Sequence, residues 1–261
     1  MNKNALLIAI IAVVAIIIVA AVLVLPPAEE EDQTATINGT EYTYEQMMDE
    51  FGTETVGDHE GVPLGAIITD TNLTSPEDHA YVLTADDGYA MAVTWDNLET
   101  GILAQITEED DDTAEEVTYL MTVFPDLPGA YSVKYLETIT PDNTILPIFC
   151  NGLDYFLDYM PKRVNEKTVS YTHNDEAFNY TGHSLSDMVN YTGLESPETH
   201  EYMIVGYEAG AEEPWYNQTV SWDGMMGGII VDEDTKVVFD DSTEYATDKY
   251  RVKYVIEILV E

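Results

Sequence analysis

Basic residues are scarce in this sequence. It has 9 Lys and Arg against 50 Asp and Glu, which gives a formal net charge of -41 over 261 residues. A surface this negative repels the phosphates of nucleic acids and anionic lipid headgroups, so we exclude nucleic-acid binding. The same charge suits a salty exterior or a surface that collects divalent cations, and it also keeps a protein soluble and monomeric.

Cysteine is nearly absent as well. Cys150 is the only one and cannot form an internal disulfide, so the fold must depend on its core alone. A hydrophobic content of 45%, with 18 Tyr and 3 Trp, is enough for packed cores. The sequence also lacks G-x-S-x-G, H-E-x-x-H and a phosphate-binding glycine loop. It therefore names no catalytic residue.

A long apolar run near the N-terminus predicts a membrane anchor. Residues 5–25 read ALLIAIIAVVAIIIVAAVLVL, without a charged or polar side chain. As a helix this run spans about 31 Å, enough to cross a bilayer, whereas the apolar core of a signal peptide has roughly 7 to 15 residues. Lys3 precedes the run and Glu29 to Asp32 follow it. The positive-inside rule then predicts a single-pass cell-membrane protein whose C-terminal domains are extracytoplasmic.

Asparagine sequons support an exterior location. The pattern N-x-[ST] predicts N-glycosylation at five positions, Asn38, Asn72, Asn179, Asn190 and Asn217.

The sequence contains an internal duplication. SPEDHAYVL from Ser75 returns as SPETHEYMI from Ser196, and three further pairs of blocks align in the same order. The four blocks share 25 identities in 66 positions. The duplication predicts the following organisation: an anchor at 1–27, an acidic linker at 28–35, a first copy at 36–142, a linker at 143–147 and a second copy at 148–261.

Each copy reads as β-rich α+β. In the first, Thr43 and Gln46 form a capping box for a helix through Phe51, and Pro63 stands where the first residue of a second helix is expected. Strands are predicted at 79–84 and 89–95 across the turn ADDG. Another pair is predicted at 117–124 and 131–140 around PDLPG.

Three motifs occur in a fixed order: GVPL (Gly61–Leu64) is followed by DGY (Asp87–Tyr89) and then by PGAYSVKYLETI (Pro128–Ile139). Their order resembles that of the molybdopterin-binding domain of sulfite-oxidase-type oxidoreductases. The resemblance covers most of residues 36–140. Through the repeat it extends to 148–261, where YRVKYVIEI keeps the last motif. It implies two tandem copies of the sulfite-oxidase-like fold after an N-terminal transmembrane helix.

The sequence departs from that family in the residues that bind the cofactor. In the family a cysteine thiolate between the first helix and the G-V-P-L helix binds molybdenum. Neither corresponding stretch, Asp49–Glu60 or Arg163–Thr181, contains cysteine. The family also holds the anionic cofactor with basic side chains. The matching positions here offer Lys134, Lys253 and the adjacent Arg251 as candidates for binding it.

Other residues allow further interpretations. Asp110, Asp111 and Asp112 offer hard oxygen ligands suited to calcium, although a solvated acidic loop is the simpler explanation for them. His79 and His200 occupy matching positions, either as a paired site or as residues that fix a strand start. Trp95 and Trp222, at matching positions, are core anchors or carbohydrate-stacking residues.

The sequence therefore favours a membrane-anchored, extracytoplasmic protein with two degenerate molybdopterin-oxidoreductase-like domains. We expect a non-catalytic binding or cell-envelope module with an unidentified protein or envelope partner and no cofactor. Two alternatives stay open. One is an oxidoreductase-like protein of the sulfite-oxidase type that keeps molybdopterin or another small ligand in the inherited pocket. The other is a calcium-dependent acidic surface or adhesion protein. A glycosylated acidic protein of this kind fits an archaeal cell surface.

Overall fold

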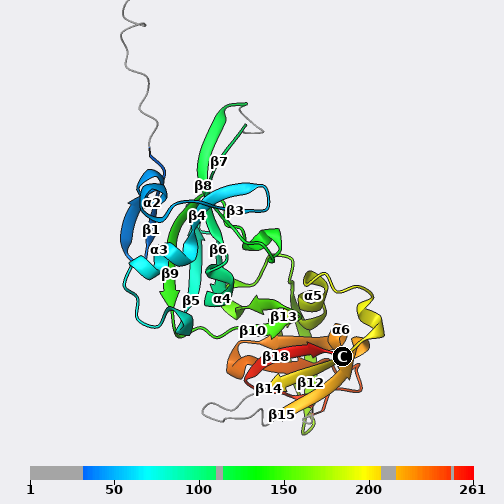
Figure 1. The fold of residues 1–261 in the computed structure, drawn as a ribbon. Helices are drawn as coiled ribbons and strands as arrows, with labels where there is room; N and C mark the ends of the chain where they lie inside the picture. The colour runs from blue at the N-terminus through cyan, green and yellow to red at the C-terminus, as the bar shows by residue number, and fades with distance from the viewer. Residues whose placement is uncertain (1–31, 110–113, 207–215, 248–249) are drawn as a thin grey trace, which may run out of the picture. The chain divides into compact units, whose positions relative to one another are not determined.

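A computed structural model describes residues 32–109, 114–206, 216–247 and 250–261 (Figure 1). Gln33–Glu261 form one compact unit. Within the described residues, no helix has the length and apolar character needed to cross a membrane. The predicted anchor at 5–25 lies outside them.

The described residues are rich in strands and contain a few short helices, so the prediction of a β-rich α+β protein is confirmed. The elements before the linker are β1 (Thr34–Ile37), β2 (Thr40–Thr43), α2 (Tyr44–Phe51), β3 (Glu54–Val56), β4 (His59–Pro63), α3 (Leu64–Asp70), η1 (Pro76–Asp78), β5 (Ala80–Ala85), β6 (Ala90–Thr94), α4 (Trp95–Leu98), β7 (Ile102–Glu109), β8 (Glu116–Val123), η2 (Gly129–Tyr131) and β9 (Leu136–Asp142).

The elements after the linker are β10 (Ile148–Cys150), β11 (Leu153–Tyr155), η3 (Leu157–Tyr159), β12 (Glu166–His173), β13 (Glu176–Ser184), α5 (Leu185–Tyr191), η4 (Pro197–Thr199), β14 (Glu201–Gly206), β15 (Tyr216–Ser221), α6 (Trp222–Gly227), β16 (Gly228–Val231), η5 (Glu233–Thr235), β17 (Lys236–Phe239) and β18 (Val255–Val260).

The two halves have the same sheet topology. Each contains a five-stranded mixed sheet, in the order β2-β1-β9-β5-β6 in the first half and β11-β10-β18-β14-β15 in the second. In both sheets the second and third strands are parallel and the other pairs are antiparallel. Each half also has an antiparallel four-stranded sheet, β3-β4-β7-β8 or β12-β13-β16-β17. We call the two halves the first and second repeats.

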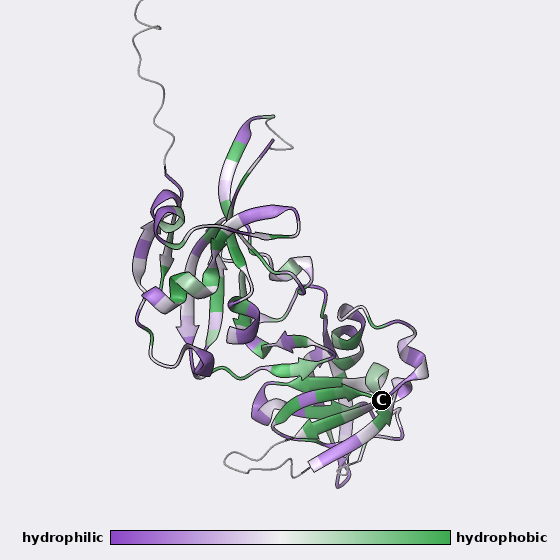
Figure 2. Ribbon diagram, in the orientation of Figure 1, coloured by the Kyte–Doolittle hydropathy of each residue, from purple (hydrophilic) through white to green (hydrophobic). Residues whose placement is uncertain are grey.

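Each repeat has its own hydrophobic core, and Figure 2 shows hydrophobic residues concentrated in the strands. In the first, α3 buries Leu64, Ile67 and Ile68 completely against the five-stranded sheet. In the second, α5 buries Leu185 and Met188 in the matching place. A fully buried side chain of this kind stabilises the fold by about 1.5–3 kcal/mol. Both repeats are therefore stabilised by buried apolar side chains rather than by an internal disulfide.

The repeated nine-residue segment forms the same turn twice. Ser75 and Ser196 both have positive φ angles, 49° and 51°, which let the chain enter a short 3-10 turn at the following proline. The buried Tyr81 hydroxyl donates to the Pro76 carbonyl at 2.9 Å, and Tyr202 donates to Pro197 at 2.6 Å. The segment is thus conserved between the repeats because it fixes a strand start.

The predicted start of α2 agrees with the structure, and the predicted start of α3 is off by one residue. Thr43 and Gln46 form both hydrogen bonds of a capping box. Pro63 is the N-cap of α3 rather than its first helical residue. The second repeat has no helix matching α2, because Pro161 falls in the middle of the aligned stretch and would remove an internal hydrogen bond. Only the short turn η3 forms there.

The strand pair predicted around PDLPG is wrong. β8 pairs with β7, and β9 pairs with β5 and β1 instead. Between them the chain crosses from one sheet to the other, and one isolated bridge joins Met121 to Lys134. Tyr135 makes the crossing with a left-handed φ of 54°, a conformation that sequence patterns do not anticipate for tyrosine.

A buried carboxylate joins the two repeats. Asp154 on β11 is 5% exposed and accepts hydrogen bonds from Thr94 and from Asn97, the latter at 2.6 Å. The Tyr131 hydroxyl donates to the Asp154 carbonyl, also at 2.6 Å. Hydrogen bonds to a charged acceptor are stronger than neutral ones, so this group fixes the second repeat against the first.

Candidate functional site

The most distinctive cavity of the described residues is built from two of the sequence motifs. It measures about 440 Å³ and lies where the D-G-Y turn meets the chain crossing at Ser132–Tyr135. Asp87 accepts a hydrogen bond from the Tyr89 amide at 2.8 Å, which holds the turn. The Asp86 amide donates to the Tyr135 carbonyl at 3.1 Å, which joins the turn to the crossing. The two motifs therefore form one corner of the first repeat.

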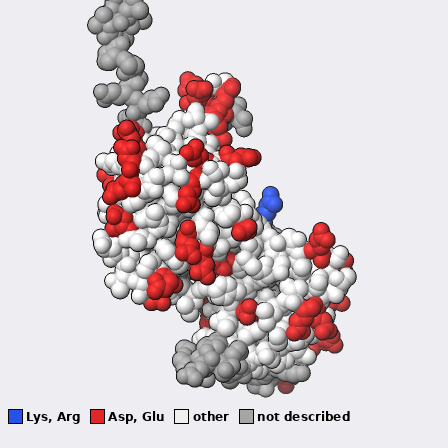
Figure 3. All heavy atoms as spheres, viewed as in Figure 1, with Lys and Arg blue, Asp and Glu red and all other residues white. Residues whose placement is uncertain are grey.

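Positive charge is concentrated at this corner. Lys134, Lys162 and Arg163 all line the cavity, and their side chains are exposed. These are three of the seven basic residues that the structure describes. On the face drawn in Figure 3, acidic side chains are widespread and basic ones appear at a single place. An excess of positive charge remains at the cavity even when Asp87 and Glu108 are set against it.

Lys134 is the most firmly positioned of the three cations. Its Nζ lies 3.0 Å from Glu108 Oε1 and 5.3 Å from the centre of the Tyr119 ring. The neighbouring Tyr119 and Glu108 raise the pKa of the Lys134 ammonium, which therefore stays charged at all physiological pH values. Both members of the ion pair are about half exposed, so the pair leaves the ammonium accessible to a ligand.

Two tyrosines supply flat apolar surface beside these charges. The Tyr89 hydroxyl donates to the Ala130 carbonyl at 2.8 Å, and Lys162 Nζ lies 4.9 Å from the centre of its ring. Burial raises the pKa of Tyr89, so its hydroxyl remains a neutral donor. Tyr135 is stacked on Tyr119 with ring centres 4.3 Å apart and is 39% exposed. The cavity can therefore contact both an anionic group and a planar ring.

A second cavity of about 470 Å³ adjoins the first. Ala130 and Arg163 line both cavities, while Asp187, Asn190 and Tyr191 line only the second. Burial raises the pKa of Tyr191, and the Arg163 guanidinium partly opposes this effect. Arg163 can therefore contact a ligand in either cavity.

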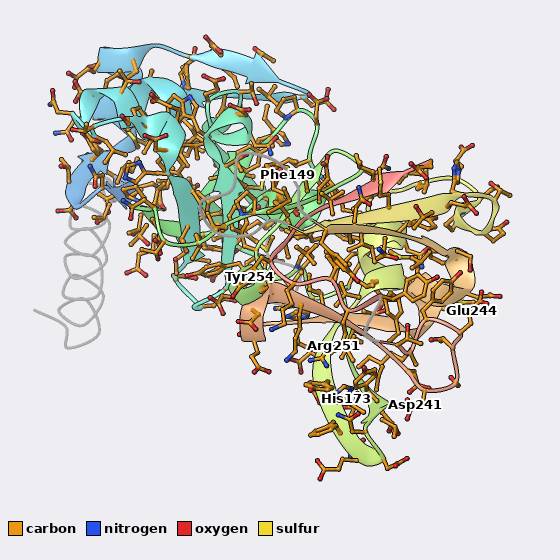
Figure 4. All side chains as sticks on the ribbon, turned by 90° about the horizontal axis from the view of Figure 1, so that it is seen from below. Phe149, His173, Asp241, Glu244, Arg251 and Tyr254 are labelled. Carbon is orange, nitrogen blue, oxygen red and sulfur yellow. The ribbon has the colours of Figure 1, made fainter. Side chains whose placement is uncertain are left out.

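The other predicted cofactor-binding residues lie elsewhere. Lys253 occupies the position in the second repeat that matches Lys134, and its Nζ is 2.8 Å from Asp234 Oδ2. Arg251 lies over the Tyr171 ring at 5.2 Å, on the side of β12 where Figure 4 also shows His173. Both belong to the second repeat, as the motif match predicts, and neither Lys253 nor Arg251 lines the cavity at Lys134.

Sequence reasoning missed Lys162 and Arg163. They are adjacent in the stretch MPKRV, and this pair stands out in a chain with so few basic residues. The adjacent pair could have been recognised from the sequence. Its proximity to Lys134 could not, because the two segments are far apart in the chain.

The predicted calcium ligands and glycosylation sites are the remaining predicted sites. Asp110, Asp111 and Asp112 lie outside the described residues, and the described part contains no group of three metal-binding side chains. Of the sequon asparagines, Asn72, Asn179, Asn190 and Asn217 are exposed. Asn38 is half-buried and its amide nitrogen donates to Thr71 Oγ1 at 3.1 Å. Glycosylation at these positions stays a prediction.

The residues do not fit a molybdenum ion of the family type. The single cysteine, Cys150, is completely buried in the core of the second repeat. Burial raises the pKa of its thiol to about 12, so it does not supply a thiolate. The cavity at Lys134 offers ammonium, guanidinium and tyrosine groups, which suit an organic anion.

In comparisons with known proteins, no family model, curated protein or solved structure matches this chain.

Proposed function

We propose that this protein is a membrane-anchored, extracytoplasmic binding protein that holds a small aromatic anion in the cavity at Lys134, Lys162 and Arg163. We include in the proposal that its repeats are degenerate relatives of sulfite-oxidase-type molybdopterin-binding domains and that it is not an enzyme. The anchor rests on the apolar run at 5–25. The relationship rests on the motif order and on the fact that two of those motifs line the cavity.

One observation carries the binding role. In a chain with a net charge of -41, three of the seven described basic residues line a single cavity. Bringing like charges together costs free energy unless an anion compensates them. Two tyrosine rings beside the cations favour a ligand that also carries a planar ring.

The proposal is tested with phenyl phosphate, which joins a ring to a dianion. The full chain, in phosphatidylcholine nanodiscs, is titrated by calorimetry at low and high salt. A charge-assisted hydrogen bond is worth about 1.5–3 kcal/mol, so Arg163→Gln is expected to weaken binding by about tenfold or more. Inorganic phosphate is expected to bind more weakly than phenyl phosphate.

The two arginines provide a matched control. Arg251→Gln removes the same charge from a position outside the cavity and is expected to leave the affinity within about twofold. Equal losses in the two variants, or no binding by the unmodified chain, would contradict the proposal. A greater loss in Arg163→Gln supports it.

A further inference from the structure

The linker and the strand β10 that follows it expose two large apolar side chains. Leu146 is 77% exposed and Phe149, labelled in Figure 4, is 44% exposed. They belong to the sequence ILPIF, residues 145–149. Exposing such side chains side by side has a cost in water that a soluble surface normally avoids. We call residues 145–149 the linker patch.

The linker patch is held in place rather than hanging free. Thr144 donates to Asp142 Oδ1 through both its amide and its hydroxyl, each at 2.7 Å, which fixes the turn before the patch. Ile145 packs against a small core formed with Phe156. Because Ile145 points inward and Leu146 outward, the patch presents Leu146 as a preorganised ridge.

A groove lies on each side of this ridge, and both grooves have acidic linings. Ile145 and Leu146 line both of them. The groove of about 250 Å³ also has Trp95 in its wall, together with three carboxylates from Glu77, Asp78 and Asp96. The groove of about 210 Å³ has two, from Asp158 and Asp232. Neither lining contains Lys or Arg.

We infer that the linker patch is a docking surface for a cationic segment of a partner protein, in which Lys or Arg alternates with apolar side chains. The apolar anchors would pack on Leu146 and Phe149 and enter the grooves, while the cations meet the five carboxylates. An anionic membrane is repelled by the same carboxylates. A second copy of this chain also has a net charge of -41, which disfavours it as the occupant.

The test uses a fluorescein-labelled nine-residue peptide in which Lys alternates with Leu and Phe. Its binding to the full chain in phosphatidylcholine nanodiscs is followed by anisotropy, with empty nanodiscs as the blank. Leu146→Ser is expected to weaken binding by about fivefold or more, because the ridge loses its apolar contact. A peptide with Ser in place of Leu and Phe is expected to bind at least about fivefold more weakly.

A second exposed apolar residue provides the control. Met226 on α6 is 45% exposed and lies outside both grooves, so Met226→Ser is expected to leave the affinity within about twofold. Equal affinities for both variants and the unmodified chain would show general attraction to a negative surface and overturn the inference. Self-association in sedimentation that Leu146→Ser abolishes would also overturn it, because the occupant would then be a second copy.

Discussion

The two repeats share one sheet topology, but corresponding residues have different roles in them. The stretch that forms α2 in the first repeat aligns with residues 157–164 in the second, where Pro161 prevents a helix. Asp49 and Glu50 on that helix correspond to Lys162 and Arg163. Without the helix, these two cations reach the D-G-Y corner of the first repeat. A stretch that forms a helix in one repeat therefore supplies part of a cavity lining in the other.

A second pair of positions shows how the repeats became joined. Glu41 and Asp154 are equivalent, each on the second strand of its repeat. Glu41 is exposed, whereas Asp154 is buried and accepts hydrogen bonds from Thr94 and Asn97 of the other repeat. The same carboxylate position is a surface residue in one copy and an interface residue in the other.

The largest expected effect tests the shared sheet topology. At Gly61 an added Cβ would collide with the Leu103 carbonyl, and at the equivalent Gly182 it would collide with that of Ile230. We expect Gly61→Val and Gly182→Val each to lower the free energy of unfolding by about 3 kcal/mol or more, measured by equilibrium urea unfolding. Gly129→Ala, where an added Cβ has nothing within 4 Å, serves as the control. A tolerated valine in only one repeat would show that the two repeats are not equivalent at this position.

The next effect tests the difference between Glu41 and Asp154. Asp154→Ala leaves the Thr94 and Asn97 donors without their acceptor, and we expect a loss of about 2–3 kcal/mol in the free energy of unfolding. Glu41→Ala is expected to change it by less than about 0.5 kcal/mol. Urea unfolding measures both variants. Similar small losses would mean that the carboxylate does not hold the repeats together.

A pH-dependent effect distinguishes Cys150 from its counterpart, Ile37. Because burial raises the pKa of the Cys150 thiol to about 12, the thiol of the unfolded chain ionises first as the pH rises. The stability from this group is complete below about pH 9 and is lost towards pH 12, by about 1.4 kcal/mol per pH unit. Unfolding at pH 8 and pH 10 should show that Cys150→Val loses less stability than the unmodified chain. An equal loss would indicate that the thiol does not contribute.

The smallest effect concerns two matched ion pairs. Lys134 pairs with Glu108 in the first repeat, and Lys253 pairs with Asp234 in the second. Since only Lys134 lines the cavity, Glu108→Gln should release it and tighten phenyl phosphate binding by about twofold. Asp234→Asn should leave that affinity unchanged. Calorimetric titration of the two variants compares them, and tighter binding in Asp234→Asn would count against the assignment of the ligand to the cavity at Lys134.

Local patterns predicted the β-rich α+β character and several element boundaries. The capping box at Thr43 joins residues three positions apart, so sequence spacing was sufficient to place it. The pair predicted around PDLPG failed because the partners of β8 and β9 lie far away in the chain. Strand pairing is a long-range choice, and a turn motif does not settle it.

The sequence predicted only part of the candidate site. Lys134 was identified through its motif, and the repeated motif gave Lys253 and Arg251 in the second repeat, outside the cavity at Lys134. Lys162 and Arg163 were not predicted as site residues, because they belong to the second repeat whereas Lys134 belongs to the first.

By itself the sequence determined the charge, the apolar N-terminal run, the duplication and the local turns, because each depends on composition or on residues close in the chain. Only the tertiary structure decided which cations share a cavity, which of two equivalent carboxylates is buried and which linker side chains stay exposed. Those outcomes depend on contacts between the repeats, where equivalent positions meet different surroundings and so acquire different roles.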